Sequence, residues 1–362
     1  MVSKRGLRRP LWYLTFVLGI VAASVVATVA SARGNAPARA GASIKVCVLL
    51  PDTTTSTRYT LFDAPLLTKA FKKAKVAALV LNAHGDPQKQ RSQAEQCLSQ
   101  GAKVFLFDQL DPASGVGITN LVIGRGGKVI DYDRLVVGSK AALYVSFDNV
   151  RVGRLMGTNL VAALKKNKKY RRHPVIAELN GDIKDNNAKL FKQGYDSVLT
   201  PLYNRGVFKR ATAGDQYTEW SSTKARGIFD QILARNNNKV DAAIAANDNL
   251  AGAVIASLKA HGLKPIPLTG QDATPTGIQF VLAGWQSGSV YKSEIKETST
   301  AAKAAIALLH GKKVKTNAVV SGTKSILLKP QWITKKNYKI LFRDKFLKRN
   351  QVCNGQYKKL CK

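Results

Sequence analysis

The fold is decided by the stretch KVIDYDR at residues 128–134, an apolar run that ends in a carboxylate followed by a guanidinium. A short run rich in Val and Ile is typical of a strand that is buried on both faces of a parallel sheet. Asp133 and Arg134 at the end of such a strand can hold a polyol, because the carboxylate accepts hydrogen bonds and the guanidinium donates them. The same two residues could form an ordinary surface ion pair, so their meaning depends on the ends of the other strands.

Outward from this stretch, strand patterns alternate with helix patterns from residue 44 onward. The first half predicts strands at 44–50, 77–82, 102–107 and 128–132, and helices at 64–75, 88–100 and 114–123. The pattern restarts after Asn149, with helices at 152–165, 188–199, 222–235, 250–261, 276–283 and 298–309, and strands at 174–179, 208–213, 242–246, 267–269 and 289–291. We therefore predict an α/β fold of two doubly wound, Rossmann-like lobes, with the ligand at the carboxyl ends of the strands where the lobes face each other.

Polar side chains follow most of the predicted strands. The clusters are Arg58-Tyr59 within the loop 52–59, Asp133-Arg134, Asp185-Asn186-Asn187, Asp215 to Trp220, Asn247-Asp248, Gln271-Asp272 and Lys292. An Asp or Asn at a strand end is often only the N-cap of the next helix, and this alternative stays open for Asn186 and Asp248. Capping alone does not account for so many clusters, and a ring such as that of Trp220 can stack on the apolar face of a sugar. We predict a polar ligand cleft between the lobes.

The N-terminus predicts export from the cytoplasm. Basic residues within 4–9 precede an uncharged apolar run at 11–32, which closes with the small-residue pattern Ala-Ser-Ala. This pattern fits a signal peptide at 1–32, followed by a linker at 33–43. Because about 20 apolar residues suffice to span a bilayer, the segment could instead remain as an uncleaved anchor. In either case we expect an extracytoplasmic protein, in the periplasm or at the outer face of the cell membrane.

The chain carries 57 Lys and Arg against 22 Asp and Glu, a formal net charge of +35. Such a charge can serve nucleic-acid binding, because basic patches neutralise phosphates. It can also coat an exported protein and hold it near an anionic cell envelope. The basic residues are scattered without a helix-turn-helix or zinc-finger motif, and an export signal argues against DNA. We therefore expect no nucleic-acid partner, and an electrostatic contact with the envelope.

The four cysteines predict one disulfide. Cys353 and Cys361 flank a turn-prone segment near the C-terminus and are expected to pair in an oxidising compartment. Cys47 in the first strand and Cys97 on a helix are expected to be free thiols that pack as small apolar side chains, although a second disulfide between them stays open. No His or Cys spacing indicates a metal site, so we expect neither a metal nor another cofactor.

The chain shows no signature of an enzyme. It has neither a Gly-x-Ser-x-Gly nor an HExxH motif, and no nucleophile with a base is evident. The glycine-rich residues 124–127 precede a strand instead of opening a helix, so they predict a turn and not a phosphate loop. We expect a binding protein without catalytic residues.

From Ile44 to Cys361 the chain resembles the sugar-binding components of ABC transporters in the periplasmic-binding-protein type 1 family, and within it the xylose-binding members. The segments that carry this resemblance are YDR at 132–134, YVSFDN at 144–149, DNNAKLF at 185–191, NNNKVD at 236–241, AND at 246–248, GQDA at 270–273 and VYK at 290–292. The resemblance implies a monomer with a three-strand hinge, which closes on a monosaccharide and delivers it to the membrane permease.

The resemblance further implies a pentose site, with D-xylose as the first expected ligand. Transferred residue by residue, the site consists of Arg58, Tyr59, Asp133, Arg134, Asn187, Trp220, Asn247, Asp272 and Lys292. The chain departs from the family in its cleft loops. Tyr59 stands where a Trp is expected, the run at 53–57 is uncharged, and the segment 215–220 is one residue shorter.

The restart of the pattern after Asn149 and the lone helix at 298–309 predict three crossings between the lobes. We expect them near Asn149, near Lys292 and within 315–320. The N-terminal lobe then comprises 44–149 with 294–315, and the C-terminal lobe comprises 150–293 with 316–362.

Two functions fit these observations. The first is a transport protein that delivers a sugar to a permease, and the second is a sensory protein whose closed form docks on a membrane receptor or kinase. A sugar-responsive transcription regulator does not fit, because an export signal occupies the place of its DNA-binding domain. The neighbouring genes would separate the first two functions.

Overall fold

The computed structural model describes residues 43–361. The predicted export signal at 1–32 and the predicted linker up to residue 42 lie outside the described residues. Between residues 43 and 361, no helix is both long enough and apolar enough to span a bilayer.

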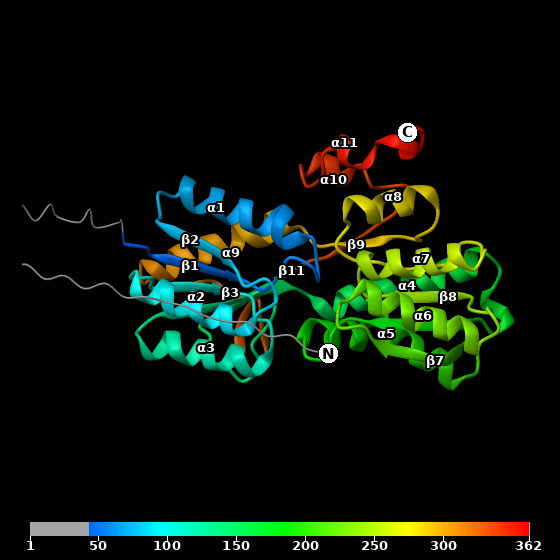
Figure 1. Ribbon diagram of the computed structural model, residues 1–362, viewed down its shortest axis with the longest axis horizontal. Coiled ribbons are helices and arrows are strands. Elements are labelled where there is room, and N and C mark those ends of the chain that lie inside the picture. The colour runs from blue at the N-terminus through cyan, green and yellow to red at the C-terminus, as the bar shows by residue number, and fades with distance from the viewer. Residues whose placement is uncertain (1–42, 362) are drawn as a thin grey trace, which may run out of the picture. The chain divides into compact units, whose positions relative to one another are not determined.

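Seven strands form the first sheet, in the order β10-β11-β5-β4-β3-β1-β2. They are β1 Val46–Leu50, β2 Ala78–Asn82, β3 Val104–Phe107, β4 Lys128–Tyr132, β5 Leu143–Phe147, β10 Ala318–Val320 and β11 Thr323–Leu328. Figure 1 labels four of them, β1, β2, β3 and β11. All neighbours are parallel except β10 and β11, which are antiparallel. The fully buried VCVLL run of β1 is the apolar pattern expected of a strand covered on both faces.

Helices cover both faces of the first sheet. They are α1 Ala64–Lys73, α2 Pro87–Ser99, α3 Pro112–Gly124 and α9 Glu294–Leu309, with a turn of π-helix, η1 Tyr59–Asp63, before α1. Alternate residues of a strand point to opposite faces. Accordingly Val48 of β1 packs in one core with α1 and α9, and Leu49 packs in another core with α2 and α3.

The second sheet has the order β7-β6-β8, and its three strands are parallel. Its elements are α4 Asn149–Lys166, η2 Tyr170–Arg172, β6 Val175–Asn180, α5 Asn186–Asn204, β7 Lys209–Tyr217, α6 Ser222–Arg235, β8 Ala242–Ala245, α7 Asp248–Ala260 and α8 Pro275–Ala283. The predicted α/β fold with two doubly wound units is confirmed.

A smaller part of the chain completes the fold beside α8. Strands β9 Ser289–Tyr291 and β12 Gln331–Ile333 pair antiparallel. The tail that follows contains α10 Ile340–Arg343, α11 Arg349–Val352 and η3 Gly355–Leu360. Apolar side chains of the tail form a core of their own with those of α8 and with Phe62 of η1.

The strand order places the segment after residue 315 in the first sheet, and not in the lobe to which it was predicted to belong. In β11, Ser325–Leu328 pair in parallel with residues 144–147 of β5, so β10 and β11 extend the first sheet. The prediction assigned this segment to the other lobe, because the sequence does not show that a strand so far along the chain returns to β5. The other predicted boundaries stay predictions.

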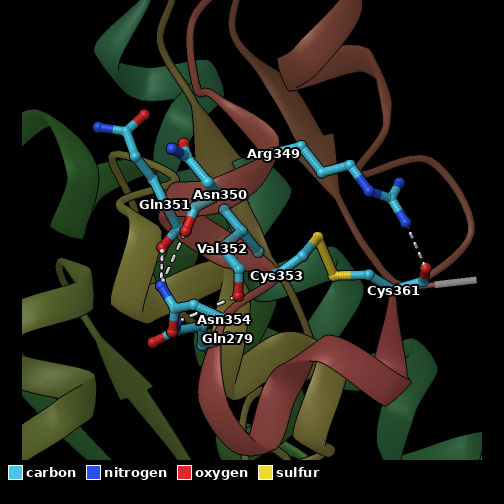
Figure 2. The surroundings of a disulfide bond; sticks show 8 residues. All are labelled: Gln279, Arg349, Asn350, Gln351, Val352, Cys353, Asn354 and Cys361. Carbon is cyan, nitrogen blue, oxygen red and sulfur yellow. Dashed lines mark hydrogen bonds between the residues drawn. A yellow bond between two sulfur atoms is a disulfide. The ribbon is translucent and has the colours of Figure 1, made fainter.

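The cysteines form two disulfides. Cys353 and Cys361 pair as predicted, with Cα atoms 5.8 Å apart (Figure 2). The expectation that Cys47 and Cys97 are free thiols is wrong, because they form a disulfide with Cα atoms 6.0 Å apart. The reason is the β–α packing: both cysteines are fully buried in the core between β1 and α2, so their side chains meet.

Replacing Cys47 and Cys97 together by Ala is expected to lower the free energy of unfolding by about 2–4 kcal/mol, measured by urea unfolding. This bond closes a sequence separation of 50 residues, whereas Cys353 and Cys361 are separated by only 8. The Cys47→Ala/Cys97→Ala variant should therefore lose more free energy of unfolding than a matched Cys353→Ala/Cys361→Ala variant does. An equal or smaller loss would contradict this account.

Candidate ligand-binding cleft

A cavity lies at the carboxyl ends of strands from both sheets. The residues that line it are Thr55, Ser56, Arg58, Tyr59, Asp133, Arg134, Asp185, Asn187, Phe191, Trp220, Asn247, Gln271, Asp272 and Lys292. Every residue that the sequence predicted as a ligand contact lines this one cavity.

Asp133 follows β4 with a left-handed backbone, at φ 58°. A residue other than glycine keeps this conformation only where its surroundings hold it. The carbonyl of Asp133 accepts hydrogen bonds from the Tyr144 and Ser146 hydroxyls, at 2.9 and 2.8 Å. Asn187 Nδ2, at the start of α5, donates a third hydrogen bond to it at 2.9 Å. These contacts fix the turn that brings the Asp133 carboxylate to the cavity.

Arg58 is buried, and carboxylates occupy its donor nitrogens. Nε and Nη2 each contact Asp63 at 2.8 Å, Nη1 contacts Asp133 Oδ1 at 2.8 Å, and Nη2 also contacts Glu297 at 2.7 Å. Burial alone would lower the pKa of Arg58, but the carboxylates of Asp133, Asp63 and Glu297 raise it well above its ordinary value. Arg58 therefore remains charged and orients Asp133.

Arg134 is held by longer contacts. Its Nη1 donates to the Gln109 carbonyl at 3.2 Å, and its Nη2 donates to Thr55 Oγ1 at 3.3 Å. Its Nε lies 3.4 Å from Asp185 Oδ2, and its guanidinium lies 5.8 Å from the centre of the Tyr59 ring. Because these contacts are longer than the best charged hydrogen bonds, Arg134 has donor capacity left for a ligand.

Asn247, which directly precedes helix α7, supplies an amide group to the cavity. Asn247 Oδ1 accepts a hydrogen bond from the Leu250 N–H at 2.9 Å, and its Nδ2 donates to the Thr55 carbonyl across the cleft at 3.4 Å. Asn247 is thus both a helix cap and a cleft residue. Asp248 does not line the cavity and instead accepts hydrogen bonds from Thr274 N–H and Ser289 Oγ, both at 2.8 Å.

Trp220 forms an aromatic wall of the cavity. Its Nε1 donates to Asp185 Oδ2 at 3.1 Å, and its ring packs edge-to-face on Phe191 with centres 6.4 Å apart. Gly181 lies directly against the ring, where an added Cβ would be 2.2 Å from a ring carbon of Trp220. Only glycine leaves room for the ring in this position.

Lys292 is buried between two carboxylates. Its Nζ lies 3.8 Å from Asp133 Oδ1 and 3.5 Å from Asp272 Oδ1. Burial alone would lower the pKa of Lys292, but Asp133 and Asp272 raise it above its ordinary value. Burial alone would raise the pKa of Asp133, but Arg58, Lys292 and Arg134 lower it below its ordinary value. Lys292 and Asp133 are therefore charged at neutral pH.

Some lining residues were missed by the sequence prediction. Thr55 and Ser56 belong to the uncharged run that departs from the family, and Asp185 and Gln271 were noticed only as neighbours of the chosen residues. Phe191 stands four residues after Asn187 on α5, a spacing that places both side chains on one helix face. That spacing is a signal from which Phe191 could have been predicted. Among residues 43–361, no cluster of His, Cys, Asp or Glu is arranged to hold a metal ion.

Asp131 is a buried carboxyl group that should make the free energy of unfolding depend on pH. It is fully buried in β4, where Oδ2 accepts a hydrogen bond from the Val136 N–H at 3.0 Å and Oδ1 has no hydrogen-bond partner. Burial raises the pKa of Asp131 to about 8. Burial likewise raises the pKa of Glu297 to about 8 and that of Asp248 to about 7.

A carboxyl whose pKa is higher in the folded state stabilises the fold fully below its unfolded pKa, about 4, and loses this contribution as pH rises through its folded pKa. The free energy of unfolding should therefore fall between pH 5 and pH 8, by up to about 1.4 kcal/mol per pH unit for each such group. We expect Asp131→Asn to flatten this fall in urea unfolding at successive pH values. A variant with the parent's full pH dependence would show that Asp131 is not responsible.

Comparisons with known proteins agree with the fold. Residues 47–313 match the family of the periplasmic binding protein domain. The chain is 33% identical over 300 residues to the D-xylose-binding periplasmic protein of Escherichia coli (strain K12), covering 80% of this chain and 87% of that protein. It is 35% identical over 267 residues to the D-xylose-binding periplasmic protein of Haemophilus influenzae, covering 71% and 77%.

A solved structure with a similar fold is an ABC transporter solute binding protein from Clostridium phytofermentans with bound β-D-glucose. Its TM-score is 0.79 at 27% identity, over 85% of this chain and 99% of that one. The chain therefore belongs to the periplasmic binding proteins, and among them to the sugar-binding proteins of ABC transporter type, which bind their ligands without catalysing a reaction.

Proposed function

We propose that this protein captures a monosaccharide in the cavity and delivers it to a membrane permease, as the substrate-binding component of an ABC sugar importer. The main support is that residues from the units around both sheets line one cavity, which Asp133, Arg134 and Lys292 share with Trp220. Carboxylates accept hydrogen bonds from sugar hydroxyls, cations donate to them, and an indole stacks on the apolar face of the ring. Such a mixture suits a sugar better than an apolar ligand.

We propose an aldopentose as the ligand, with D-xylose first. Two relatives with about one third identical residues are named for D-xylose, whereas a similar structure holds β-D-glucose. A pentopyranose lacks the hydroxymethyl group of a hexose, so the two kinds of sugar differ in the space that they require. Thr55, Ser56 and Tyr59, which lie where the chain departs from its family, are the residues we expect to set this preference.

Closure follows from the division of the site between the sheets. Contacts already join its two sides: Ser56 Oγ donates to Asp272 Oδ2 at 3.2 Å, and Asn187 Nδ2 donates to the Asp133 carbonyl at 2.9 Å. A sugar that touches both sides stabilises the closed state, which a permease can then distinguish from the open one. A sensory receptor could use the same closed state. Genes for a permease and an ATPase beside this gene would support transport, and a gene for a kinase would support sensing.

A panel of pentoses and hexoses tested by thermal unfolding checks the proposal. A ligand at about a hundred times its Kd adds about 2.7 kcal/mol to the stability of the folded state, which raises Tm by several degrees. We expect D-xylose to raise Tm more than D-glucose does. A larger rise with D-glucose would reassign the ligand to a hexose, and no rise with any sugar would overturn the proposed function.

We also propose that the protein acts outside the cytoplasm and that its positive charge contacts the anionic cell envelope. In the described chain, the connections that lead into the amino ends of β1, β2, β3 and β4 contain exposed Lys or Arg and no Asp or Glu; they are 43–45, 72–77, 99–103 and 124–127. The connections that follow β1, β2, β3, β4 and β5 at the carboxyl ends each contain Asp. The charge is thus segregated, with the basic end opposite the cleft.

Reversing three charges at this basic end tests the envelope contact. We expect the parent to sediment with vesicles that contain anionic phosphatidylglycerol at low salt, and not with neutral phosphatidylcholine vesicles. Replacing Lys72, Lys73 and Lys75 by Glu should release most of the protein. Equal sedimentation with both kinds of vesicle would contradict an electrostatic contact.

A further inference from the structure

Phe346, in the tail between α10 and α11, stacks on two aromatic rings from different parts of the fold. Its ring centre lies 4.3 Å from that of Phe62, with the planes 21° apart, and 4.8 Å from that of Tyr291, with the planes 46° apart. Phe62 belongs to η1 beside the first sheet, and Tyr291 ends β9. Phe346 is only 4% exposed, so its ring is fixed between the other two.

Both neighbours of Phe346 directly precede a residue of the charged network. Phe62 is followed by Asp63, which holds Arg58 through two contacts of 2.8 Å. Tyr291 is followed by Lys292. A displacement of either ring would therefore reach a cation of the cleft through one or two residues.

These two cations meet at one atom. Arg58 Nη1 and Lys292 Nζ approach the same carboxylate oxygen, Oδ1 of Asp133, at 2.8 and 3.8 Å. The hydrogen bonds of its carbonyl hold the left-handed backbone of Asp133, at φ 58°, whereas the two cations hold its carboxylate. The rings that contact Phe346 thus support both cations that bracket Asp133.

The end of the tail is held by contacts with α8 and by its own disulfide, as Figure 2 shows. Gln279 Nε2 of α8 donates to the Val352 carbonyl and to Asn354 Oδ1, both at 3.1 Å. Arg349 Nη2 donates to the Cys361 carbonyl at 2.9 Å, and the disulfide from Cys361 closes the loop. Phe346 is therefore attached to α8 by an anchored segment and does not belong to a free chain end.

We propose that Phe346 is a positioning residue for the ligand site. Held by the anchored tail against Phe62 and Tyr291, it fixes η1 and β9 so that Arg58 and Lys292 hold Asp133 in place for the sugar. This inference rests on the proposed sugar-binding function and assigns part of the ligand affinity to a residue that does not line the cavity.

The test compares Phe346→Ala with Phe342→Ala. Phe342 is a matched control, because its half-buried ring lies in the same tail but packs edge-to-face on Tyr338, with centres 5.7 Å apart. Two quantities are measured: the Kd for D-xylose by calorimetry, and the hydrogen exchange of the amides at 59–63 in the sugar-free protein.

We expect Phe346→Ala to raise the Kd by at least about tenfold, roughly 1.4 kcal/mol, and to speed exchange at 59–63. Phe342→Ala should leave the Kd within about twofold of the parent value, even if it lowers Tm. Phe346→Leu, which retains most of the apolar volume, should restore most of the affinity.

Equal Kd values and equal exchange rates for Phe346→Ala and Phe342→Ala would overturn the inference. Faster exchange along the whole chain, with no excess at 59–63, would also overturn it, because it would show only general destabilisation. The exchange measurement needs no ligand. If the parent protein binds no sugar, the proposed function fails, while the exchange comparison still supports or overturns the positioning role of Phe346.

Discussion

Replacing Asp133 by Ala is expected to weaken sugar binding by about tenfold to a hundredfold or more. A hydrogen bond that involves a charged group is worth about 1.5–3 kcal/mol, and about 1.4 kcal/mol corresponds to a factor of ten in Kd. The substitution also removes the carboxylate that Arg58 and Lys292 share, at 2.8 and 3.8 Å. Two buried cations would then lose a counter-charge, which should disorder the cavity beyond the loss of one ligand contact.

The control for this measurement is Asp196→Ala on α5. Asp196 contacts Lys192 at 3.2 Å and does not line the cavity, so its removal should leave the Kd for the sugar unchanged. Calorimetry of both variants against the same sugar measures the difference. If Asp133→Ala binds the sugar as tightly as the parent does, the assignment of the site is wrong.

Replacing Arg58 by Met is expected to lower the free energy of unfolding by about 3–5 kcal/mol, the cost of removing one partner from a buried charge network. Arg58 is 2% exposed and contacts Asp63, Asp133 and Glu297 at 2.7–2.8 Å. Without the guanidinium, Asp63 and Asp133 lose the cation that they share in a buried site, and an uncompensated buried charge is costly. Urea unfolding at pH 7 measures the loss.

Glu297→Gln is the matched control for the Arg58 variant. Burial raises the pKa of Glu297 to about 8, so a neutral side chain resembles its state at pH 7. Glu297 Oε1 has no hydrogen-bond partner, and the other oxygen can still accept from Arg58 as an amide carbonyl. We expect a loss of about 1 kcal/mol or less. A loss with Arg58→Met no larger than that with Glu297→Gln would contradict the importance of this network.

The fold was predictable because βα units leave strong local patterns. The apolar run of β4 and the restart of the pattern at α4 are visible in the sequence and recur in the structure. The predicted strand at 267–269 is reduced to a single bridge from Leu268 to Ala243. Pro265 and Pro267 explain this outcome, because proline lacks the N–H that a ladder requires. The pairing of β11 with β5 was not predictable, since no local pattern reports a partner so distant in the chain.

The candidate cleft was predictable as a set of strand ends, but the roles of its residues were not. Arg58 was chosen as a ligand contact, whereas in the structure carboxylates occupy its donors. One of them, Glu297, is 239 residues away in sequence, so no spacing could have indicated the pair. The Cys47–Cys97 disulfide was missed for a related reason, because the way a helix packs over a strand decides which buried side chains meet.

The central claim is that the cleft binds a monosaccharide, and calorimetric titration of the unmodified protein with D-xylose tests it most directly. We predict saturable binding of one sugar per chain, with a Kd that rises when Trp220 is replaced by Ala and the stacking face is lost. Titrations with other pentoses and with hexoses under the same conditions should give weaker binding. The absence of saturable binding for D-xylose and for every other sugar in the panel would contradict the claim.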